Sequence, residues 1–311
     1  MTSSVILRTL AIALPTLGLL HTAAYWWRLR RTRADDAARF PVNRDGIIPG
    51  AAPITLSASA THAALLIHGF ADTPQTLRLL SEYLHREHGW TTRAPLLPGH
   101  GRTLAAFDAS GLRAWRDAVH VEYLDLKARH ETVVLVGLSM GGALATLEAS
   151  IDESLPALVL LAPYLTPPAR AQRLAPLANL INLMVPYLKG GDREKSIFDP
   201  AARALSLGYG ASPPKRVRDL VAVADDARFA AATVRAPTLL IHSRTDYRIP
   251  VSLAEQHPDF FRNAATCDQQ WVDGCGHVIT VDYCRERVWA LTAEWLSRFA
   301  GAPRGESGQV A

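Results

Sequence analysis

The chain has 311 residues, of which 49% are apolar and 20% are charged, and its formal net charge is +4. This balance excludes a disordered chain, and the length suits one large α/β domain or two modest domains. The basic residues form no stripe interleaved with aromatic residues, so we expect no nucleic-acid partner.

The first 33 residues form a hydrophobic segment that is separate from the rest of the chain. Residues 9–27 carry no charged side chain apart from His21, and as a helix they would extend about 28 Å, close to the thickness of a bilayer core. Aromatic residues end the stretch at Trp27, and arginines follow directly. We expect a single-pass membrane anchor, and the arginine excess after the span predicts that the downstream domain is cytoplasmic. The alternative is a soluble cytoplasmic protein whose first helix packs on the globular domain.

Two irregular segments flank the regular part of the chain. Residues 34–61 contain prolines and glycines that interrupt any long helix, and they predict a linker that leads into one or two first strands. Residues 301–311 are a polar tail that we expect to be disordered. The main domain is therefore expected to span residues 62–300.

Within this domain, short apolar runs alternate with segments of helical spacing. Strands are expected near residues 63–67, 91–95, 132–136, 158–161, 238–241 and 269–272, and helices near residues 75–88, 112–130 and 285–299. Another helix, rich in small residues, should begin at Met140. The alternation predicts an α/β fold with a mostly parallel central sheet and helices on both faces.

One interval, residues 164–234, breaks this alternation. It contains helix-like pieces but no strong strand, and it is too long for an ordinary connection between two strands. Its apolar content favours an inserted helical lid over the carboxyl edge of the sheet. A long solvated excursion is the alternative. We call this interval the lid insertion.

A candidate nucleophile follows the strand near residues 132–136. The sequence Gly137-Leu138-Ser139-Met140-Gly141-Gly142 contains the pattern G-x-S-x-G between a strand and a helix. Glycines two residues before and after the serine allow a sharp turn without steric clashes, and the turn exposes the hydroxyl at a helix N-terminus. Ser139 is therefore the predicted nucleophile.

A serine hydroxyl needs a base, and the base needs an acid that orients it. His277 follows the last strand and Asp246 follows the strand before it, so both should lie at the carboxyl edge that also presents Ser139. Asp273 is the alternative acid, but it lies only four residues from His277. The three residues follow one another in the order serine, aspartate, histidine, which is one of the chain orders in which such triads occur.

Two backbone N–H groups are candidates for stabilising a developing oxyanion. One belongs to Met140, directly after the nucleophile, and the other to Phe70, in the loop His68-Gly69-Phe70 after the first strong strand. His100 lies in a second glycine-containing loop, and we interpret it as a structural residue that braces the site.

The three cysteines are Cys267, Cys275 and Cys284. They are too few for a disulfide framework, and their spacing matches no zinc site. A Cys275–Cys284 bridge is compatible with the sequence, but we expect buried free thiols.

Together these motifs give residues 62–299 a resemblance to the α/β-hydrolase superfamily, and within it to bacterial carboxylesterases and monoacylglycerol lipases, which are grouped with serine aminopeptidase-like hydrolases. Five stretches in order carry the resemblance: His68-Gly69-Phe70-Ala71-Asp72-Thr73-Pro74, Leu97-Pro98-Gly99-His100-Gly101, Gly137-Leu138-Ser139-Met140-Gly141-Gly142, Asp246-Tyr247-Arg248-Ile249-Pro250 and Gly276-His277-Val278-Ile279-Thr280. The resemblance implies a catalytic triad of Ser139, Asp246 and His277, an oxyanion hole at Phe70 and Met140, and a lid.

We therefore expect a carboxylic-ester hydrolase that forms an acyl-enzyme on Ser139 and needs no metal or organic cofactor. The apolar lid insertion and the hydrophobic N-terminal segment favour lipid-derived substrates, such as monoacylglycerols or medium-chain acyl esters. Two alternatives remain: an amide or peptide hydrolase on the same fold, and a non-catalytic binding protein.

Overall fold

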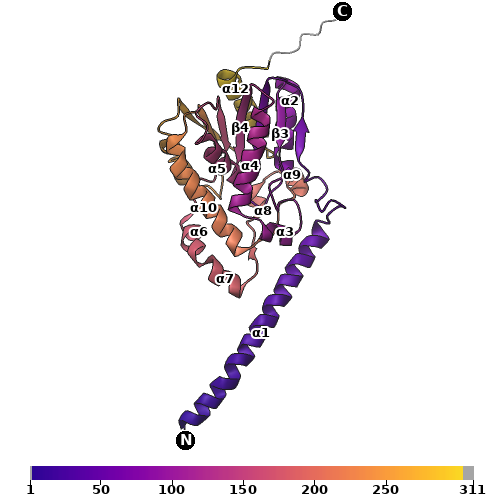
Figure 1. Cartoon of the computed structure of the whole chain (residues 1–311), viewed down its shortest axis with the longest axis vertical. Coiled ribbons are helices and arrows are strands. Elements are labelled where there is room, and N and C mark those ends of the chain that lie inside the picture. Colours follow the sequence, from indigo (N-terminus) through magenta and orange to yellow (C-terminus); the bar gives the residue numbers. More distant parts are fainter. Residues whose placement is uncertain (1, 304–311) are drawn as a thin grey trace, which may run out of the picture.

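A seven-stranded sheet forms the centre of the computed structural model, which describes the backbone of residues 2–303 and the side chains of residues 14–303 (Figure 1). The strands are β1 (Ile54–Leu56), β2 (His62–Ile67), β3 (Thr91–Ala94), β4 (Thr132–Leu138), β5 (Leu158–Leu161), β8 (Thr238–Ser243) and β9 (Cys267–Val272). Their order across the sheet is β1-β3-β2-β4-β5-β8-β9, and only the β1–β3 pair is antiparallel. The predicted mostly parallel sheet is confirmed.

Helices cover both faces of this sheet because its central strands are apolar on both sides. In β2, Leu65 and Ile67 belong to one core layer, whereas Ala64 and Leu66 belong to the other. The principal helices of the first layer are α4 (Leu112–Lys127), α5 (Met140–Ala149) and α10 (Pro214–Ala230), and those of the second are α2 (Arg78–His88) and α12 (Arg285–Ala300). The predicted α/β architecture is therefore confirmed.

The lid insertion lies between β5 and β8 and is mainly helical. Besides α10 it contains the short elements α6 (Ala169–Leu174), η2 (Ala175–Leu177), α7 (Ala178–Met184), α8 (Arg193–Ser196) and α9 (Pro200–Leu205), followed by η3 (Ala231–Thr233). Two short strands, β6 (Leu188–Lys189) and β7 (Ala211–Ser212), pair antiparallel apart from the main sheet. The remaining short elements of the described chain are η1 (Pro74–Leu77), α3 (Leu104–Ala109), α11 (Val251–Ala254) and η4 (Pro258–Phe260).

The N-terminal segment is a single long helix, α1 (Thr2–Arg39), which projects from the domain (Figure 1). Its near end contacts the domain, since Arg33 donates to the Tyr187 hydroxyl over 2.8 Å and lies 3.8 Å from the Asp108 carboxylate. Farther out, the His21 ring is 3.0 Å from the carbonyl of Leu183 in α7. The helix thus continues six residues past the predicted boundary at residue 33, into the segment predicted as a linker.

Among residues 14–303, whose side chains the structure describes, no helix is both long enough and apolar enough to cross a membrane. This finding contradicts the predicted transmembrane helix, and the membrane partner and location inferred from it lose their support. In the part of α1 from residue 14 on, Pro15, Gly18 and His21 dilute the apolar stretch, and the same helix continues through the arginines that begin at Arg28.

The cysteine prediction is corrected as well. Cys275 and Cys284 form a disulfide, and Cys267 is the free cysteine of the chain. The loop between β9 and α12 turns back on itself, which brings the two sulfurs together although nine positions separate them in the sequence. This loop carries His277. The predicted disordered tail lies mostly outside the described residues, which end at residue 303.

Candidate active site

Ser139 lies at the sharp turn between β4 and α5. Its backbone has φ 54° and ψ −115°, a strained conformation for a residue with a side chain. The flanking glycines leave no room for side chains, because a Cβ at Gly137 would lie 2.3 Å from the Gly141 carbonyl oxygen, and one at Gly141 would lie 2.0 Å from that of Ile67. The turn therefore requires both glycines of the motif, and it holds the serine hydroxyl at the carboxyl edge of the sheet.

The three residues predicted as a triad are joined by hydrogen bonds. His277 Nε2 is 2.8 Å from Ser139 Oγ, and His277 Nδ1 is 2.6 Å from Asp246 Oδ2. In this arrangement Nδ1–H donates to the carboxylate, which leaves Nε2 free to accept the serine proton. Asp273, the alternative acid, is exposed and lies 3.8 Å from Arg244 instead.

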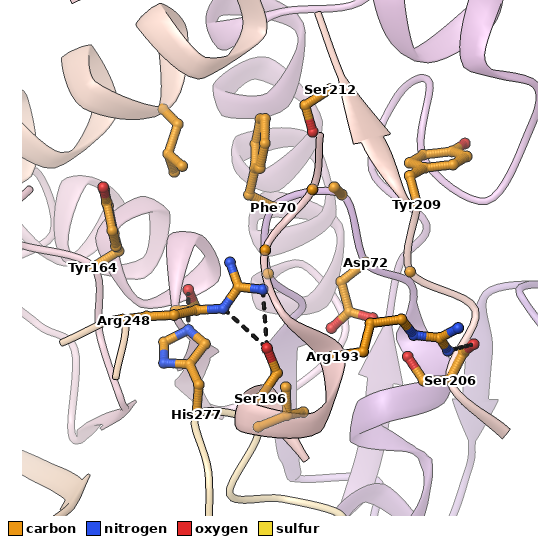
Figure 2. A pocket seen from close by; sticks show the side chains of 18 of the residues that line it. Phe70, Asp72, Tyr164, Arg193, Ser196, Ser206, Tyr209, Ser212, Arg248 and His277 are labelled. Carbon is orange, nitrogen blue, oxygen red and sulfur yellow. Dashed lines mark hydrogen bonds between the residues drawn. The ribbon is translucent and has the colours of Figure 1, made fainter. Parts of the chain in front are cut away.

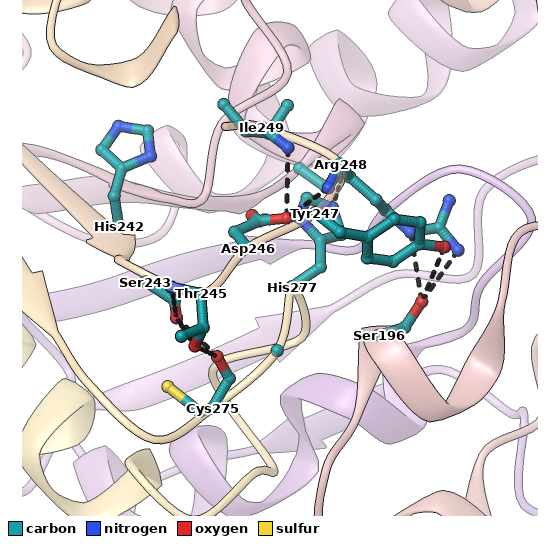
Figure 3. A network of polar contacts seen from close by, with 12 residues as sticks. Ser196, His242, Ser243, Thr245, Asp246, Tyr247, Arg248, Ile249, Cys275 and His277 are labelled. Carbon is teal, nitrogen blue, oxygen red and sulfur yellow. Dashed lines mark hydrogen bonds and ion pairs between the residues drawn. The ribbon is translucent and has the colours of Figure 1, made fainter. Parts of the chain in front are cut away.

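The surroundings of Asp246 favour its ionised form. Burial opposes ionisation, but the interaction with His277 and two backbone N–H groups outweighs it, and the pKa of Asp246 lies below its usual value. The two N–H groups belong to Arg248 and Ile249 and donate to Oδ1 over 2.7 and 3.1 Å (Figure 3). Asp246 can therefore stabilise an imidazolium at His277 while staying ionised itself.

The two predicted oxyanion donors lie on either side of the serine. Met140 is the first residue of α5, where a helix leaves its N–H groups without an intrahelical acceptor. The Phe70 N–H donates to no backbone carbonyl among the described residues. A Cβ on Gly69 would lie 3.4 Å from the Ser139 Cβ, so this loop runs directly against the nucleophile. The geometry is compatible with an oxyanion hole formed by Phe70 and Met140.

Two buried histidines brace the loop that carries Phe70. His68 Nδ1 is 2.9 Å from the Gly69 carbonyl, and its Nε2 accepts the Leu97 N–H over 3.1 Å. These bonds require a neutral ring with its proton on Nδ1. The centre of the His100 ring lies 5.0 Å from that of the His68 ring. The Nδ1 atom of His100 lies 3.2 Å from the Pro98 carbonyl oxygen. His100 thus has the bracing position predicted for it, whereas the sequence did not indicate the contacts of His68.

Buried histidines should make the fold sensitive to acid. Burial lowers the pKa of His68 and of His257 to about 4, below the 6.5 of an unperturbed histidine. The unfolded chain therefore binds more protons between these values, so stability is complete above about pH 6.5 and is lost as the pH falls toward 4. We expect the free energy of unfolding, measured with urea, to fall by a few kcal/mol over this window.

The matched variants are His257→Gln and, at an exposed position, His21→Gln. The first should flatten the pH dependence and the second should not. A free energy of unfolding that stays constant from pH 7.5 to 5 would contradict the prediction.

A buried carboxylate, Asp282, connects the loop that carries His277, between β9 and α12, to the lid insertion. It accepts the N–H of Gly276 over 2.7 Å and those of Phe198 and Asp199 over 2.8 Å each. It also accepts the N–H of Tyr283 at the start of the turn into α12. Sequence reasoning missed this residue, because three of the four donors lie outside its immediate neighbourhood in the chain.

We expect Asp282→Ala to destabilise the protein by at least about 3 kcal/mol, because several buried N–H groups would lose their acceptor. Thermal unfolding monitored by circular dichroism measures the loss. The control is Asp268→Ala, at an exposed carboxylate on β9, which should shift the midpoint little. Equal midpoints for the two variants would argue against the assigned role of Asp282.

Ser139 and His277 open into a cavity of about 440 Å³ (Figure 2). The loop of Phe70 forms one wall, and the lid insertion supplies another through residues between Pro168 and Leu220. Apolar side chains line much of it, with a smaller set of charged ones that the sequence did not single out: Asp72, Lys189, Arg193 and Arg248. The described residues contain no cluster of side chains suited to holding a metal ion.

A strained serine hydrogen-bonded to histidine and aspartate, at the carboxyl edge of a mostly parallel sheet, is the arrangement of α/β hydrolases. Residues 64–291 match the profile of the alpha/beta hydrolase family. The chain therefore belongs to this family.

Two curated relatives cover most of the chain. A thermostable monoacylglycerol lipase from Bacillus sp. (strain H-257) is 25% identical over 262 residues, which are 82% of this chain and 98% of the lipase. A carboxylesterase from Bacillus subtilis (strain 168) is 26% identical over 239 residues, which are 76% of this chain and 92% of the esterase.

Solved structures agree with the fold. A structure from the work on the metagenome-derived lipolytic enzymes LipS and LipT has a TM-score of 0.71 at 24% identity and covers 81% of this chain and 99% of its own. The monoacylglycerol lipase of Paleococcus ferrophilus has a TM-score of 0.67 at 19% identity and covers 79% of this chain and 98% of its own. At these identities the likeness supports the α/β-hydrolase fold alone.

Proposed function

We propose that the protein is a serine hydrolase that cleaves carboxylic esters through an acyl-enzyme on Ser139. The observation that carries the proposal is the hydrogen-bonded chain from Asp246 through His277 to Ser139, which opens into the cavity. Carboxylic-ester hydrolysis is also the activity for which both curated relatives are named.

In the proposed reaction, Ser139 Oγ attacks the ester carbonyl while its proton moves to His277 Nε2. The Phe70 and Met140 N–H groups hold the oxyanion, and each such donor contributes about 3–4 kcal/mol to the transition state. The carbon–oxygen bond to the alcohol then breaks, and His277 returns the proton to the departing oxygen. Water, deprotonated by the same nitrogen, attacks the acyl-enzyme and releases the acid together with the free serine.

The substrates we propose are lipid-derived esters, such as monoacylglycerols or medium-chain acyl esters. Much of the cavity wall is apolar, and side chains such as Phe70, Leu138 and Val278 adjoin the catalytic residues there. Burying one methylene of an acyl chain against such a wall stabilises the complex by about 0.8 kcal/mol. Activity should therefore rise with chain length until the cavity is full.

A series of 4-nitrophenyl esters from two to twelve acyl carbons, assayed on the full chain, tests this proposal. Amino-acid 4-nitroanilides in parallel test the alternative amide hydrolase, and a fluorophosphonate probe tests the non-catalytic alternative. We expect ester turnover with a maximum at medium chain length, and labelling of Ser139. Faster hydrolysis of the anilides, or a chain that neither turns over esters nor reacts with the probe, would refute the proposal.

A further inference from the structure

The cavity wall carries more positive than negative charge. Among the described residues, it includes three cationic side chains, Lys189, Arg193 and Arg248, but a single carboxylate, Asp72. An apolar ester needs none of these charges. A cavity with this balance suits a substrate that itself bears negative charge.

The two arginines have different partners. Arg193 Nη2 donates to the carbonyls of Arg203 and Ser206 at the end of α9, over 3.1 and 2.7 Å, so this side chain holds the lid insertion together. The Arg248 guanidinium has one hydrogen-bond partner among the described residues, the uncharged hydroxyl of Ser196. Within the same part of the chain, no carboxylate forms an ion pair with it.

The Arg248 guanidinium is held in place on three sides. Its Nε and Nη2 both lie near Ser196 Oγ, at 3.2 and 3.0 Å, and its Cζ lies 5.3 Å from the centre of the Tyr247 ring. On the third side, a Cβ on Gly191 would lie 2.6 Å from Nη2. Figure 2 shows the remaining nitrogen pointing away from Ser196, toward Phe70. The guanidinium group of Arg248 is therefore positioned before any ligand binds, and some of its N–H groups have no acceptor among the described residues.

The carboxylate that lines the same cavity, Asp72, does not occupy these donors. The pKa of Asp72 is about 6, because burial raises it more than its hydrogen bonds and the Arg248 charge lower it. Its Oδ2 accepts the Thr76 hydroxyl over 2.7 Å, and it makes no ion pair with Arg248. A planar guanidinium with unpaired donors in a half-enclosed cavity is suited to binding a carboxylate or phosphate oxygen.

We propose that Arg248 forms an anion subsite in the catalytic cavity, and that the preferred substrates are esters that carry a carboxylate or another small anionic group. The inference rests on the proposed function, because it concerns the ester held at Ser139. It narrows the proposed substrates to esters with an anionic group. That group can be a carboxylate at the end of the acyl chain or an anion on the alcohol. Matched esters of both kinds distinguish these two sources.

The test compares kcat/KM for two matched pairs of esters on the full chain. In the first pair, 4-nitrophenyl hydrogen glutarate has the anion on the acyl group, and 4-nitrophenyl pentanoate is neutral. In the second pair, 4-butanoyloxybenzoate has the anion on the leaving group, and its methyl ester is neutral. Arg248→Met should lower the anionic-to-neutral ratio of one pair by about ten-fold or more, because charge-assisted hydrogen bonds are lost. The pair that responds identifies the side on which the anion binds.

A purely structural role of Arg248, as a clamp between Ser196 and its own loop, gives a different result. It would lower kcat/KM for both members of a pair by the same factor and leave both ratios unchanged, which would overturn the inference. Gly191→Ala provides a second variant, because the added methyl group displaces the guanidinium without removing its charge, and it should shift the same ratio downward.

Arg244→Met is the matched control. Arg244 lies on the same loop but outside the cavity, over the Trp271 ring and beside Asp273, and its loss should leave the ratios unchanged. If the wild-type chain hydrolyses the neutral esters and Arg248→Met leaves both anionic-to-neutral ratios of kcat/KM unchanged, the subsite is refuted while the proposed function stands. A chain that hydrolyses none of the four esters would refute both.

Discussion

Ser139→Ala should lower kcat for 4-nitrophenyl butanoate by about six orders of magnitude, as removal of the nucleophile does in comparable triads. The hydroxyl that attacks the carbonyl is lost, whereas the turn keeps its strained backbone and both of its glycines. Labelling by a fluorophosphonate, measured as intact mass, should vanish as well. The thermal midpoint should stay close to that of the wild type, because a single oxygen atom is removed.

The control for this prediction is Ser150→Ala, at the opposite end of α5, where the hydroxyl donates to the Leu147 carbonyl over 2.7 Å and lies outside the catalytic cavity. This variant should keep wild-type turnover. If Ser139→Ala retained one per cent or more of the wild-type kcat (an activity loss of about two orders of magnitude instead of six), another nucleophile would have to be sought.

Asp246→Asn should lower kcat by about four orders of magnitude. The amide nitrogen of asparagine would donate toward His277 Nδ1, which would favour the tautomer with the proton on Nε2. That tautomer cannot accept the proton of Ser139. The backbone N–H groups of Arg248 and Ile249 would still find an oxygen acceptor, so the loop should keep its shape.

Asp273→Asn discriminates between the two candidate acids. Asp273 is exposed and lies beside Arg244, so its substitution should change kcat by less than about two-fold. The two variants should also differ in pH profile, since only Asp246 stabilises the imidazolium. A larger loss from Asp273→Asn than from Asp246→Asn would reverse the assignment.

The central site was predictable because few backbone arrangements satisfy its local sequence. A strand followed by two glycines around a serine permits little else than the observed turn, and parallel strands bring their carboxyl ends to one edge. Ser139, Asp246 and His277 therefore meet although more than 100 residues separate the first from the other two. The mostly parallel sheet follows from the same alternation of strands and helices.

Features that depend on contacts between distant segments were not predictable in this way. The sequence around Asp282 does not predict that the N–H groups of Phe198 and Asp199 donate to it, because they come close only once the lid insertion is folded. Arg248 was visible merely as a neighbour of Asp246. That its guanidinium has Ser196 as its only hydrogen-bond partner among the described residues follows from the folded cavity.

The two errors have local causes. Helix length suggested a membrane span, but it does not measure how far Thr, Gly and Pro weaken an apolar stretch. The cysteines were judged by number and spacing, whereas a disulfide depends on the path of the chain between them. The turn after His277 reverses that path and joins Cys275 to Cys284.

The attachment of α8 to the histidine loop limits how the enzyme can admit its substrate. The Ser196 carbonyl accepts the Val278 N–H over 3.0 Å, its hydroxyl contacts Arg248, and a Cβ on Gly276 would lie 2.5 Å from that same carbonyl oxygen. Lifting α8 would therefore pull on the segment that positions His277. A gate that opens without dismantling the catalytic geometry has to hinge outside α8. The part of the insertion at α8 is thus tied to the segment that carries His277.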